Sequence, residues 1–341
     1  MELQILDHLP DGFLDAPARE LSGVLPGPAL FDLPGREDAP LFVSVLLHGN
    51  EDTGLLAVQD VLRRHVGRDL PRRMILFVGN VVAAAAGVRT LDSQLDFNRA
   101  WPGTLSPDAP EAKLMRDVVD YVAVREPFAS IDIHNNTGLN PHYACLNRLD
   151  ARYLHLARLF SRTVVFFEQP VGVQSAAMAE ICPAVTVECG KPGETSATEH
   201  AAQFVEACLA LSHFPDQPLP DADFDLLRTF AVVRVPPEIS ISFDGAPADI
   251  RFRTDIDHLN FSEVLPGTPF ADVPAGAGVP LEVAPGTEAP VPDYFAETGG
   301  ELRLVEPAIP SMLTRDVRAV RLDCLCYLMH RIGLDGKKLP D

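Results

Sequence analysis

Two rhythms of apolar and polar positions alternate along the first two thirds of the chain. Runs that are almost wholly apolar predict buried strands at residues 40–47, 72–80, 128–134, 163–167 and 183–190. Between them, apolar residues recur every three or four positions, which predicts amphipathic helices at residues 53–65, 108–124, 150–162 and 196–214. Buried strands separated by such helices are typical of a mostly parallel sheet that is covered on both faces.

The pattern changes after a segment rich in proline and aspartate, residues 215–224, which predicts a linker. Beyond it, short β-rich segments are separated by proline and glycine, as at residues 230–236, 239–245 and 250–256. We therefore predict an α/β fold with a mostly parallel, mixed central sheet flanked by helices. This domain is expected over residues 1–215, and a smaller β-rich C-terminal domain over residues 222–341.

Composition and charge narrow the choice of partners. Of the 341 residues, 47% are hydrophobic and 22% charged, and the net charge is −20. So acidic a chain argues against nucleic acid and anionic membranes as partners, although a local group of arginines can still bind a small anion. We expect no signal peptide, because the N-terminus has neither a basic nor an apolar region of that kind. We expect no membrane span, because no apolar stretch approaches about 18 residues. The sequence leaves the oligomeric state open, and a homo-oligomer is compatible with it.

The six cysteines lie in apolar segments, and we interpret them as reduced core residues, which favours a cytoplasmic location. Cys324 and Cys326 form a C-x-C pair. A structural zinc site would need two further cysteine or histidine ligands at suitable spacing, so we interpret this pair as part of the core.

Residues suited to metal chemistry follow three of the predicted strands. His48 and Glu51 follow the first, and His134 and Glu188 end two later ones. Ligands of open parallel sheets lie at the carboxyl ends of the strands, and a catalytic zinc takes three protein ligands and one water. His48 and Glu51 could share an ion across a tight turn that Gly49 permits, with His134 as third ligand. Glu188 could then manage the proton of the activated water.

Each of these residues also has a simpler interpretation. His48 fits a solvated strand end, His134 a hydrogen-bonded core histidine, and Glu188 a surface or helix-capping acid. Their joint position at strand ends of one α/β region is what favours a hydrolytic metal site.

Four motifs occur in the order "HGNE", "DFNRAWPG", "DIHNNTG" and "VECG". In this order they resemble the succinylglutamate desuccinylase/aspartoacylase family of the zinc-carboxypeptidase superfamily. The resemblance covers roughly residues 40 to 200 and is much weaker elsewhere. It implies that one zinc ion is bound by three residues, which are His48, Glu51 and His134.

The same resemblance implies roles for further residues. Glu188 would be the general base, Arg89 would polarise the scissile carbonyl, and Asn98 and Arg99 would hold a substrate carboxylate. Relatives also bring a tyrosine over the active site from the C-terminal region, for which Tyr294 is the candidate. Phe97 and Trp101 replace residues that are often Leu and Phe, and keep an apolar wall. The stretch "CGKPGE" after Val187 and Glu188 departs from the named enzymes and leaves the acyl group open.

Two residues near these motifs are candidates from position alone. Asp132 shares a strand face with His134 and could orient it, or face solvent as an ordinary strand-end acid. His142 is interpreted as a pocket-lining or structural residue.

The expected activity is hydrolysis of an amide next to a carboxylate in a small anionic substrate. An N-acyl amino acid is the leading substrate class, and a short peptide cleaved by a carboxypeptidase is the alternative. A non-catalytic zinc-binding homologue is a further alternative. A serine or cysteine hydrolase is disfavoured, because the chain has no G-x-S-x-G motif and Cys189 should point away from the face of Glu188.

Overall fold

The computed structural model describes residues 3–215, 217, 219–286 and 293–339. The chain divides into two compact units. The first contains residues 1–135, 142–166 and 170–225, and the second contains residues 136–141, 167–169 and 226–341. Asp216 and Pro218, within the predicted linker, lie outside the described residues.

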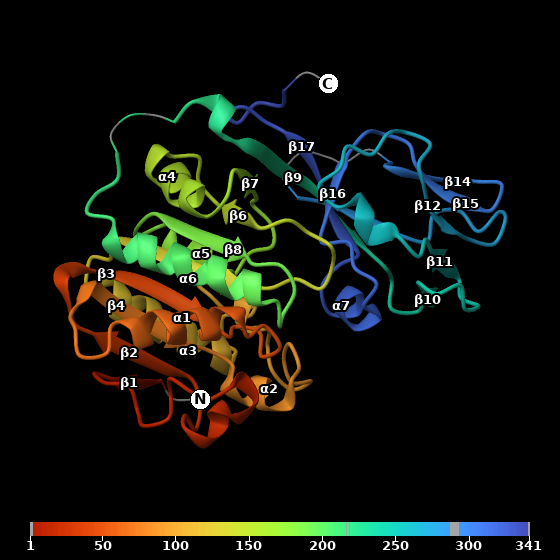
Figure 1. Cartoon of the computed structure of the whole chain (residues 1–341). Helices are drawn as coiled ribbons and strands as arrows, with labels where there is room; N and C mark the ends of the chain where they lie inside the picture. The colour runs from red at the N-terminus through yellow and green to blue at the C-terminus, as the bar shows by residue number, and fades with distance from the viewer. Residues whose placement is uncertain (1–2, 216, 218, 287–292, 340–341) are drawn as a thin grey trace. The chain divides into compact units, whose positions relative to one another are not determined.

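The first unit is built on a mixed sheet with strand order β1-β2-β4-β3-β5-β8-β6-β7 (Figure 1). The central strands β4, β3, β5 and β8 run parallel. The outer pairs β1–β2 and β6–β7 are each parallel within themselves, and they join the central strands through the antiparallel pairs β2–β4 and β6–β8. The bounds are β1 Gln4–Leu6, β2 Ala29–Leu33, β3 Gly35–Val45, β4 Leu70–Val78, β5 Ala129–His134, β6 Tyr143–Leu146, β7 Thr163–Phe166 and β8 Ala184–Glu188. The predicted α/β fold class is confirmed, and the carboxyl ends of β3, β5 and β8 meet at one edge.

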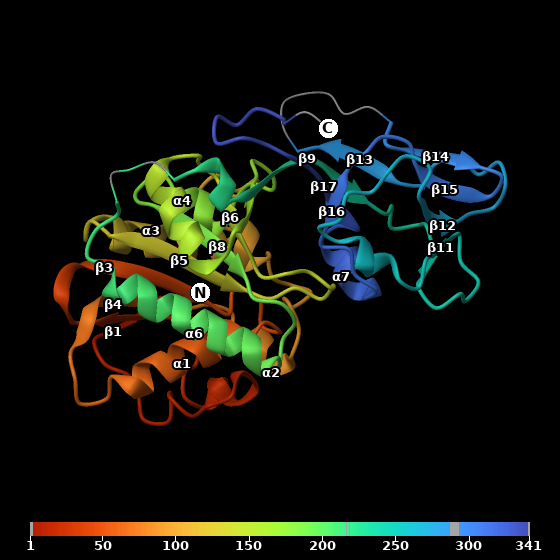
Figure 2. The same ribbon diagram turned by 45° about the horizontal axis from the view of Figure 1, so that its top comes forward.

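Helices cover both faces of this sheet. Helices α1 and α6 lie side by side on one face, and α3 lies on the other (Figure 2). Helix α5 contacts β5 and β8. The bounds are α1 Thr53–Arg64, α2 Val81–Ala86, α3 Pro110–Ala123, α4 Ala151–Phe160, α5 Gln174–Met178 and α6 Thr195–Ala210, with short 3₁₀ helices at Ala18–Gly23, Phe97–Arg99 and Asp221–Asp223. The predicted helices correspond to α1, α3, α4 and α6.

The core of the first unit is continuous along the central strands. Leu41, Phe42, Val43 and Val45 of β3 are fully buried, and so are the apolar residues at the end of β4. Trp101 is fully buried too, and its ring meets those of Phe42 and Phe77 edge to face, at centroid distances of 6.4 and 6.0 Å. These contacts anchor the loop that carries Asn98 and Arg99 to the sheet.

The second unit is β-rich and has a core of its own. Strands β9, β13, β16 and β17 pair antiparallel, and a five-stranded sheet has the order β10-β11-β12-β15-β14. The bounds are β9 Asp225–Arg234, β10 Ile241–Ser242, β11 Ile250–Phe252, β12 Pro269–Asp272, β13 Glu282–Pro285, β14 Phe295–Thr298, β15 Glu301–Leu304, β16 Ile309–Ser311, β17 Cys326–Arg331 and α7 Val317–Leu322, with a one-turn helix at Ile256–Leu259. Fully buried side chains of this core include Ile250, Phe270, Leu302 and Leu328.

All six cysteines are free, and five of them are buried. Cys324 and Cys326 are 5% and 0% exposed and pack in the second unit. Burial raises the pKa of the Cys182 thiol to about 12 and raises the pKa values of the other five thiols as well. Within the described residues, no helix is both long and apolar enough to cross a membrane.

Candidate functional site

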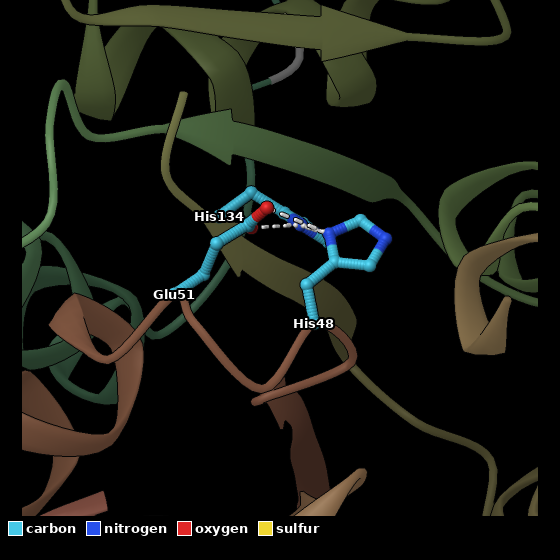
Figure 3. Close-up of side chains that lie close together, drawn as sticks. All are labelled: His48, Glu51 and His134. Carbon is cyan, nitrogen blue, oxygen red and sulfur yellow. Dashed lines mark hydrogen bonds and ion pairs between the residues drawn. The ribbon is translucent and has the colours of Figure 1, made fainter. Parts of the chain in front are cut away.

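Three side chains converge where β3 and β5 end (Figure 3). His48 and Glu51 come from the turn between β3 and α1, and His134 is the last residue of β5. One donor atom from each lies within 4.8 Å of the other two, and all three residues are buried. The structure therefore brings together the three residues that the sequence suggested as metal ligands.

The contacts within this His48–Glu51–His134 cluster are short. His48 Nδ1 lies 2.8 Å from Glu51 Oε1, and His134 Nδ1 lies 2.8 Å from Glu51 Oε2. The two Nδ1 atoms are 3.2 Å apart. Two ring nitrogens and a carboxylate thus face one another at a buried point.

The outer ring nitrogens are held by carboxylates. His134 Nε2 lies 2.8 Å from Asp132 Oδ2, and His48 Nε2 lies 3.0 Å from Asp96 Oδ1. An ionised carboxylate only accepts, so each Nε2–H can donate to its carboxylate. With a metal ion bound, each Nδ1 would be free of hydrogen and would present its lone pair to the ion. Three converging electron-pair donors repel one another unless a cation lies between them. This carboxylate–histidine arrangement is the usual support of a metal-binding histidine, so the residues fit a metal ion.

The electrostatics of the cluster also favour positive charge. Although burial disfavours its charged form, Asp132 and Glu51 hold the pKa of His134 well above its ordinary value. Burial likewise opposes ionisation of Glu51, yet His48 and His134 lower its pKa. The site therefore keeps Glu51 as a carboxylate and stabilises a cation beside it.

Gly49 is required by space rather than by a left-handed backbone. A Cβ atom at this position would lie 2.2 Å from the backbone nitrogen of Ala84 and 2.3 Å from the carbonyl carbon of Ala83. Its backbone N–H donates to the carbonyl oxygen of Arg89, at 3.0 Å. The tight turn predicted at Gly49 is thus held against α2 and the segment that follows it.

Glu188 ends β8, directly beside the cluster. Its Cα is the register partner of His134, so the two side chains lie on the same face of the sheet. Glu188 is 9% exposed, and its Oε2 atom has no hydrogen-bond partner among the described residues. Burial raises the pKa of Glu188 to about 7, although the nearby His134 opposes the shift. A buried carboxyl that titrates near neutrality is suited to taking up and releasing a proton.

The segment after α2 brings its polar residues to the same place. Arg89 Nε donates to Asp96 Oδ2 at 3.0 Å, and Arg89 Nη1 lies 3.7 Å from Glu51 Oε1. Asn98 is 7% exposed, with its Nδ2 atom 3.2 Å from His134 Nε2 and its Oδ1 atom accepting from the backbone N–H of Gln174. Arg99 donates through Nη1 to the carbonyl oxygen of Asn98 at 2.7 Å.

The remaining sequence candidates lie in other surroundings. Asp132 is fully buried and accepts from Ser44 Oγ at 2.6 Å as well as contacting His134, so it is not a solvent-facing acid. The His142 ring packs 4.8 Å from that of His200. Tyr294 belongs to the second unit, where its ring lies 4.9 Å from that of Phe230.

Two residues of the site were missed from sequence. Asp96 contacts His48 and Arg89, and Asn135 donates its backbone N–H to Glu51 Oε2 at 3.1 Å. Both lie inside quoted motifs, and the available signal was their polarity within otherwise buried segments. Cys189, in contrast, is fully buried, and burial followed by the charge of Glu188 holds its thiol pKa well above the ordinary value. A buried thiol that resists ionisation is a poor nucleophile.

Comparisons with known proteins identify the family and the fold. Residues 40–213 match the succinylglutamate desuccinylase/aspartoacylase catalytic domain. No curated protein sequence matches the chain.

Several solved structures share the fold. Succinylglutamate desuccinylase from Chromobacterium violaceum is 16% identical with a TM-score of 0.56, over 88% of this chain and 87% of that one. Murine aminoacylase 3 is 15% identical with a TM-score of 0.57, over 87% and 97% of the two chains. A product-bound ectoine utilization protein from Ruegeria pomeroyi is 16% identical with a TM-score of 0.53, over 89% and 88%. The resemblance seen in the motifs is confirmed, and the chain belongs to the succinylglutamate desuccinylase/aspartoacylase family.

Proposed function

We propose that the protein is a zinc-dependent hydrolase that cleaves an amide bond next to a carboxylate, and that its substrate is an N-acyl amino acid. One observation carries the proposal. Two histidines and a glutamate converge on one point while the carboxyl group of Glu188, at the next strand end, is buried with its Oε2 atom unpartnered. Such a donor set beside an acid/base group is the arrangement of a hydrolytic zinc site.

The ion we expect is a single zinc, held by His48, Glu51 and His134. Two imidazole nitrogens and one carboxylate are a common ligand set of catalytic zinc. Zinc in such a site supplies Lewis acidity, which lowers the pKa of water and withdraws charge from a carbonyl oxygen.

The proton transfers fall to Glu188 in this proposal. As a carboxylate it takes the proton of the attacking water, and as an acid it delivers a proton to the departing amine. A pKa of about 7 allows both forms near neutral pH. We expect the Arg89 guanidinium, whose Nη1 atom lies 3.7 Å from Glu51 Oε1, to stabilise negative charge that develops on the carbonyl oxygen.

Substrate binding is assigned to three residues. Arg99 presents a planar guanidinium that suits a substrate carboxylate. The amide of Asn98 already contacts His134 and Gln174, so we expect it to hold Arg99 and the cluster in place as much as the substrate. Tyr294 is proposed as a further substrate contact from the second unit.

The first test is release of free amino acid by the zinc-loaded protein from N-acetyl, N-succinyl and N-formyl amino acids and from simple dipeptides. We expect release from acyl amino acids. Release from dipeptides alone would make the protein a carboxypeptidase. Silence on the whole panel, with zinc confirmed by elemental analysis, would favour a non-catalytic zinc-binding homologue.

The second test is Glu188→Gln, which keeps the shape of the side chain and removes its acid/base chemistry. We expect kcat to fall by about 10²- to 10⁴-fold, with the zinc content unchanged. Glu199→Gln is the matched control, because Glu199 is an exposed acid on α6. Turnover by Glu188→Gln at the rate of the control would contradict the proposed mechanism.

A further inference from the structure

A buried asparagine ties together the segments around the cluster. Asn135 follows His134 directly and is 3% exposed. Its Nδ2 atom donates to Thr53 Oγ1 at 2.9 Å and to the carbonyl oxygen of Gly190 at 3.0 Å. Its Oδ1 atom accepts from the backbone N–H of Thr53 at 3.3 Å. One amide group thus joins the end of β5, the start of α1 and the loop after β8.

The chemistry of these partners requires an amide in one orientation. A backbone carbonyl can only accept a hydrogen bond, and a backbone N–H can only donate one. The Gly190 carbonyl therefore needs the Nδ2 atom of Asn135, and the Thr53 N–H needs its Oδ1 atom. Aspartate has the same shape but lacks the donors, so it cannot bind the Gly190 carbonyl.

The bond to Gly190 bears on where Glu188 lies. On one side, strand pairing places Glu188 opposite His134, and the N–H of Cys189 donates to the carbonyl oxygen of His134 at 2.9 Å. On the other side the chain turns at Gly190, with φ of +77°, and leaves the sheet. Because Glu188 Oε2 has no partner among the described residues, the backbone on these two sides carries much of its positioning.

We propose that Asn135 is a positioning residue, which holds Glu188 at a set distance from the His48–Glu51–His134 cluster by binding the Gly190 carbonyl. This inference rests on the proposed function, since it concerns the acid/base role of Glu188. A general base acts only within hydrogen-bond reach of the proton that it takes. A displacement of about 1 Å at a reacting group can cost about 100-fold in rate.

The test uses Asn135→Ala and Asn135→Asp in the full-length, zinc-loaded protein. Both variants keep the backbone N–H that binds Glu51 and lose the donor to Gly190. We expect kcat to fall about 10- to 100-fold, while KM and the zinc dissociation constant stay within about threefold. If zinc affinity falls together with kcat, Asn135 acts by holding Glu51 rather than Glu188, and the proposal is overturned.

Two matched variants separate positioning from stability. Thr53→Val removes the Oγ1 acceptor and leaves the Gly190 bond, so its kcat should stay close to that of the wild type. Asn260→Ala removes another buried asparagine, in the second unit, whose amide binds the backbone N–H and carbonyl of Leu313 at 2.9 and 2.8 Å. If Asn135→Ala loses no more turnover than Asn260→Ala, Asn135 serves only stability and the proposal fails.

Hydrogen–deuterium exchange gives a readout that needs no substrate. Peptides that cover residues 188–194 should exchange faster in Asn135→Ala than in the wild type, and should not do so in Thr53→Val. Unchanged exchange in Asn135→Ala would overturn the proposal even in an active enzyme. If the protein cleaves none of the substrates, the proposed function is refuted. Faster exchange in Asn135→Ala would then still show that Asn135 holds the loop after β8.

Discussion

The two histidines of the cluster are oriented by carboxylates that come from different parts of the chain. Asp132 precedes His134 by two residues on one strand, whereas Asp96 reaches His48 from 48 residues away. Asp96 also accepts from Arg89 and from the backbone N–H of Asn98. Burial opposes its ionisation, but Arg89 and His48 hold the pKa of Asp96 well below the ordinary value. Asp96 therefore stays charged and fixes both His48 and Arg89.

Replacing Asp96 with asparagine should weaken the metal site. The amide NH₂ group would face either the Nε2–H of His48 or the Nε–H of Arg89, and both of these atoms donate. We expect zinc affinity to fall by about 10- to 100-fold, measured by competition with a chromogenic chelator. Asp92→Asn is the control, because Asp92 is an exposed acid in the same segment. Equal affinities of Asp96→Asn and the control would show that Asp96 does not orient His48.

The convergence of His48, Glu51 and His134 could be predicted from sequence because these residues follow apolar runs in a recognisable order. Asp96 and Asn135 could not, since their partners are set by how loops return to the sheet. The sequence allowed Asp132 either to orient His134 or to face solvent. Its burial and the hydrogen bond from Ser44 exclude the solvent-facing position. Spacing along the chain predicts which residues end the strands, whereas contacts across the sheet edge depend on tertiary structure.

Strand β2 carries one charged residue, Asp32, in an otherwise apolar stretch, and several donors bind its carboxylate. Asp32 accepts from Nε and Nη2 of Arg73 at 2.6 Å each, from the hydroxyl of Tyr121 at 2.7 Å and from Arg125 at 3.1 Å. Burial raises the pKa of Asp32, but the hydrogen bonds from Arg73 and Tyr121 outweigh it and lower the pKa below the ordinary value. This network joins β2, β4 and α3.

The Asp32 network should make stability depend on pH in the acid range. A carboxyl group whose pKa is lowered by folding stabilises the protein above its unfolded pKa, near 3.9, and loses that contribution as pH falls through the folded value. Asp32→Asn should therefore cost about 1–3 kcal/mol at pH 7, and the difference from the wild type should shrink below pH 4. Urea unfolding at pH 7, 5 and 3 measures it.

Asp38→Asn serves as the control. Asp38 is an exposed acid close to Arg73, but it is not part of the hydrogen-bond network around Asp32. A gap between wild type and Asp32→Asn that stays constant down to pH 3 would contradict the assignment.

Elements were predictable in proportion to their regularity. The apolar runs of β3, β4, β5 and β8 and the three-to-four spacing of α1, α3 and α6 were read correctly. Strands β1, β2 and β6, of 3, 5 and 4 residues, were missed. Strands β7 and β8 are equally short but were predicted, because each lies in an apolar run that follows or precedes a periodic helix. The pairing of β1, β2 and β6 is decided by neighbours rather than by their own sequence.

We expect zinc to stabilise the first unit against unfolding and to leave the stability of the second unit unchanged. All three cluster residues lie in the first unit, and the core of the second is formed by its own residues from 231 to 328. The single tryptophan, Trp101, also lies in the first unit. Its fluorescence should therefore report the unfolding of the unit that contains the His48–Glu51–His134 cluster.

Removal of zinc with a chelator should lower the midpoint of the tryptophan transition. An ion that binds only the folded state adds about 2.7 kcal/mol when its concentration is 100 times the dissociation constant. Far-UV circular dichroism reports the secondary structure of both units. It should show a second unfolding transition, that of the β-rich unit, whose midpoint the chelator does not change. Glu51→Gln, which weakens the ligand set, should respond to neither zinc nor chelator. If the midpoint of the tryptophan transition is the same with and without zinc, the proposed metal site is refuted.

The division of the chain was harder to predict than its elements. A proline-rich stretch marks the place where the pattern changes, yet the second unit also takes in residues 136–141 and 167–169. Nothing in the hydrophobic pattern sets these short segments apart. Their membership follows from contacts with residues far along the chain, as between Glu168 and Arg228 and between Asn140 and Met312.

The burial of the native thiols makes the protein a convenient host for chemical labels. None of the six cysteines is exposed, and the raised pKa values of their thiols keep them in the unreactive form near neutral pH. A cysteine introduced at an exposed position of either unit would react with maleimides far faster than these six. Fluorophores or spin labels could thus be attached at one chosen point without first removing a native residue.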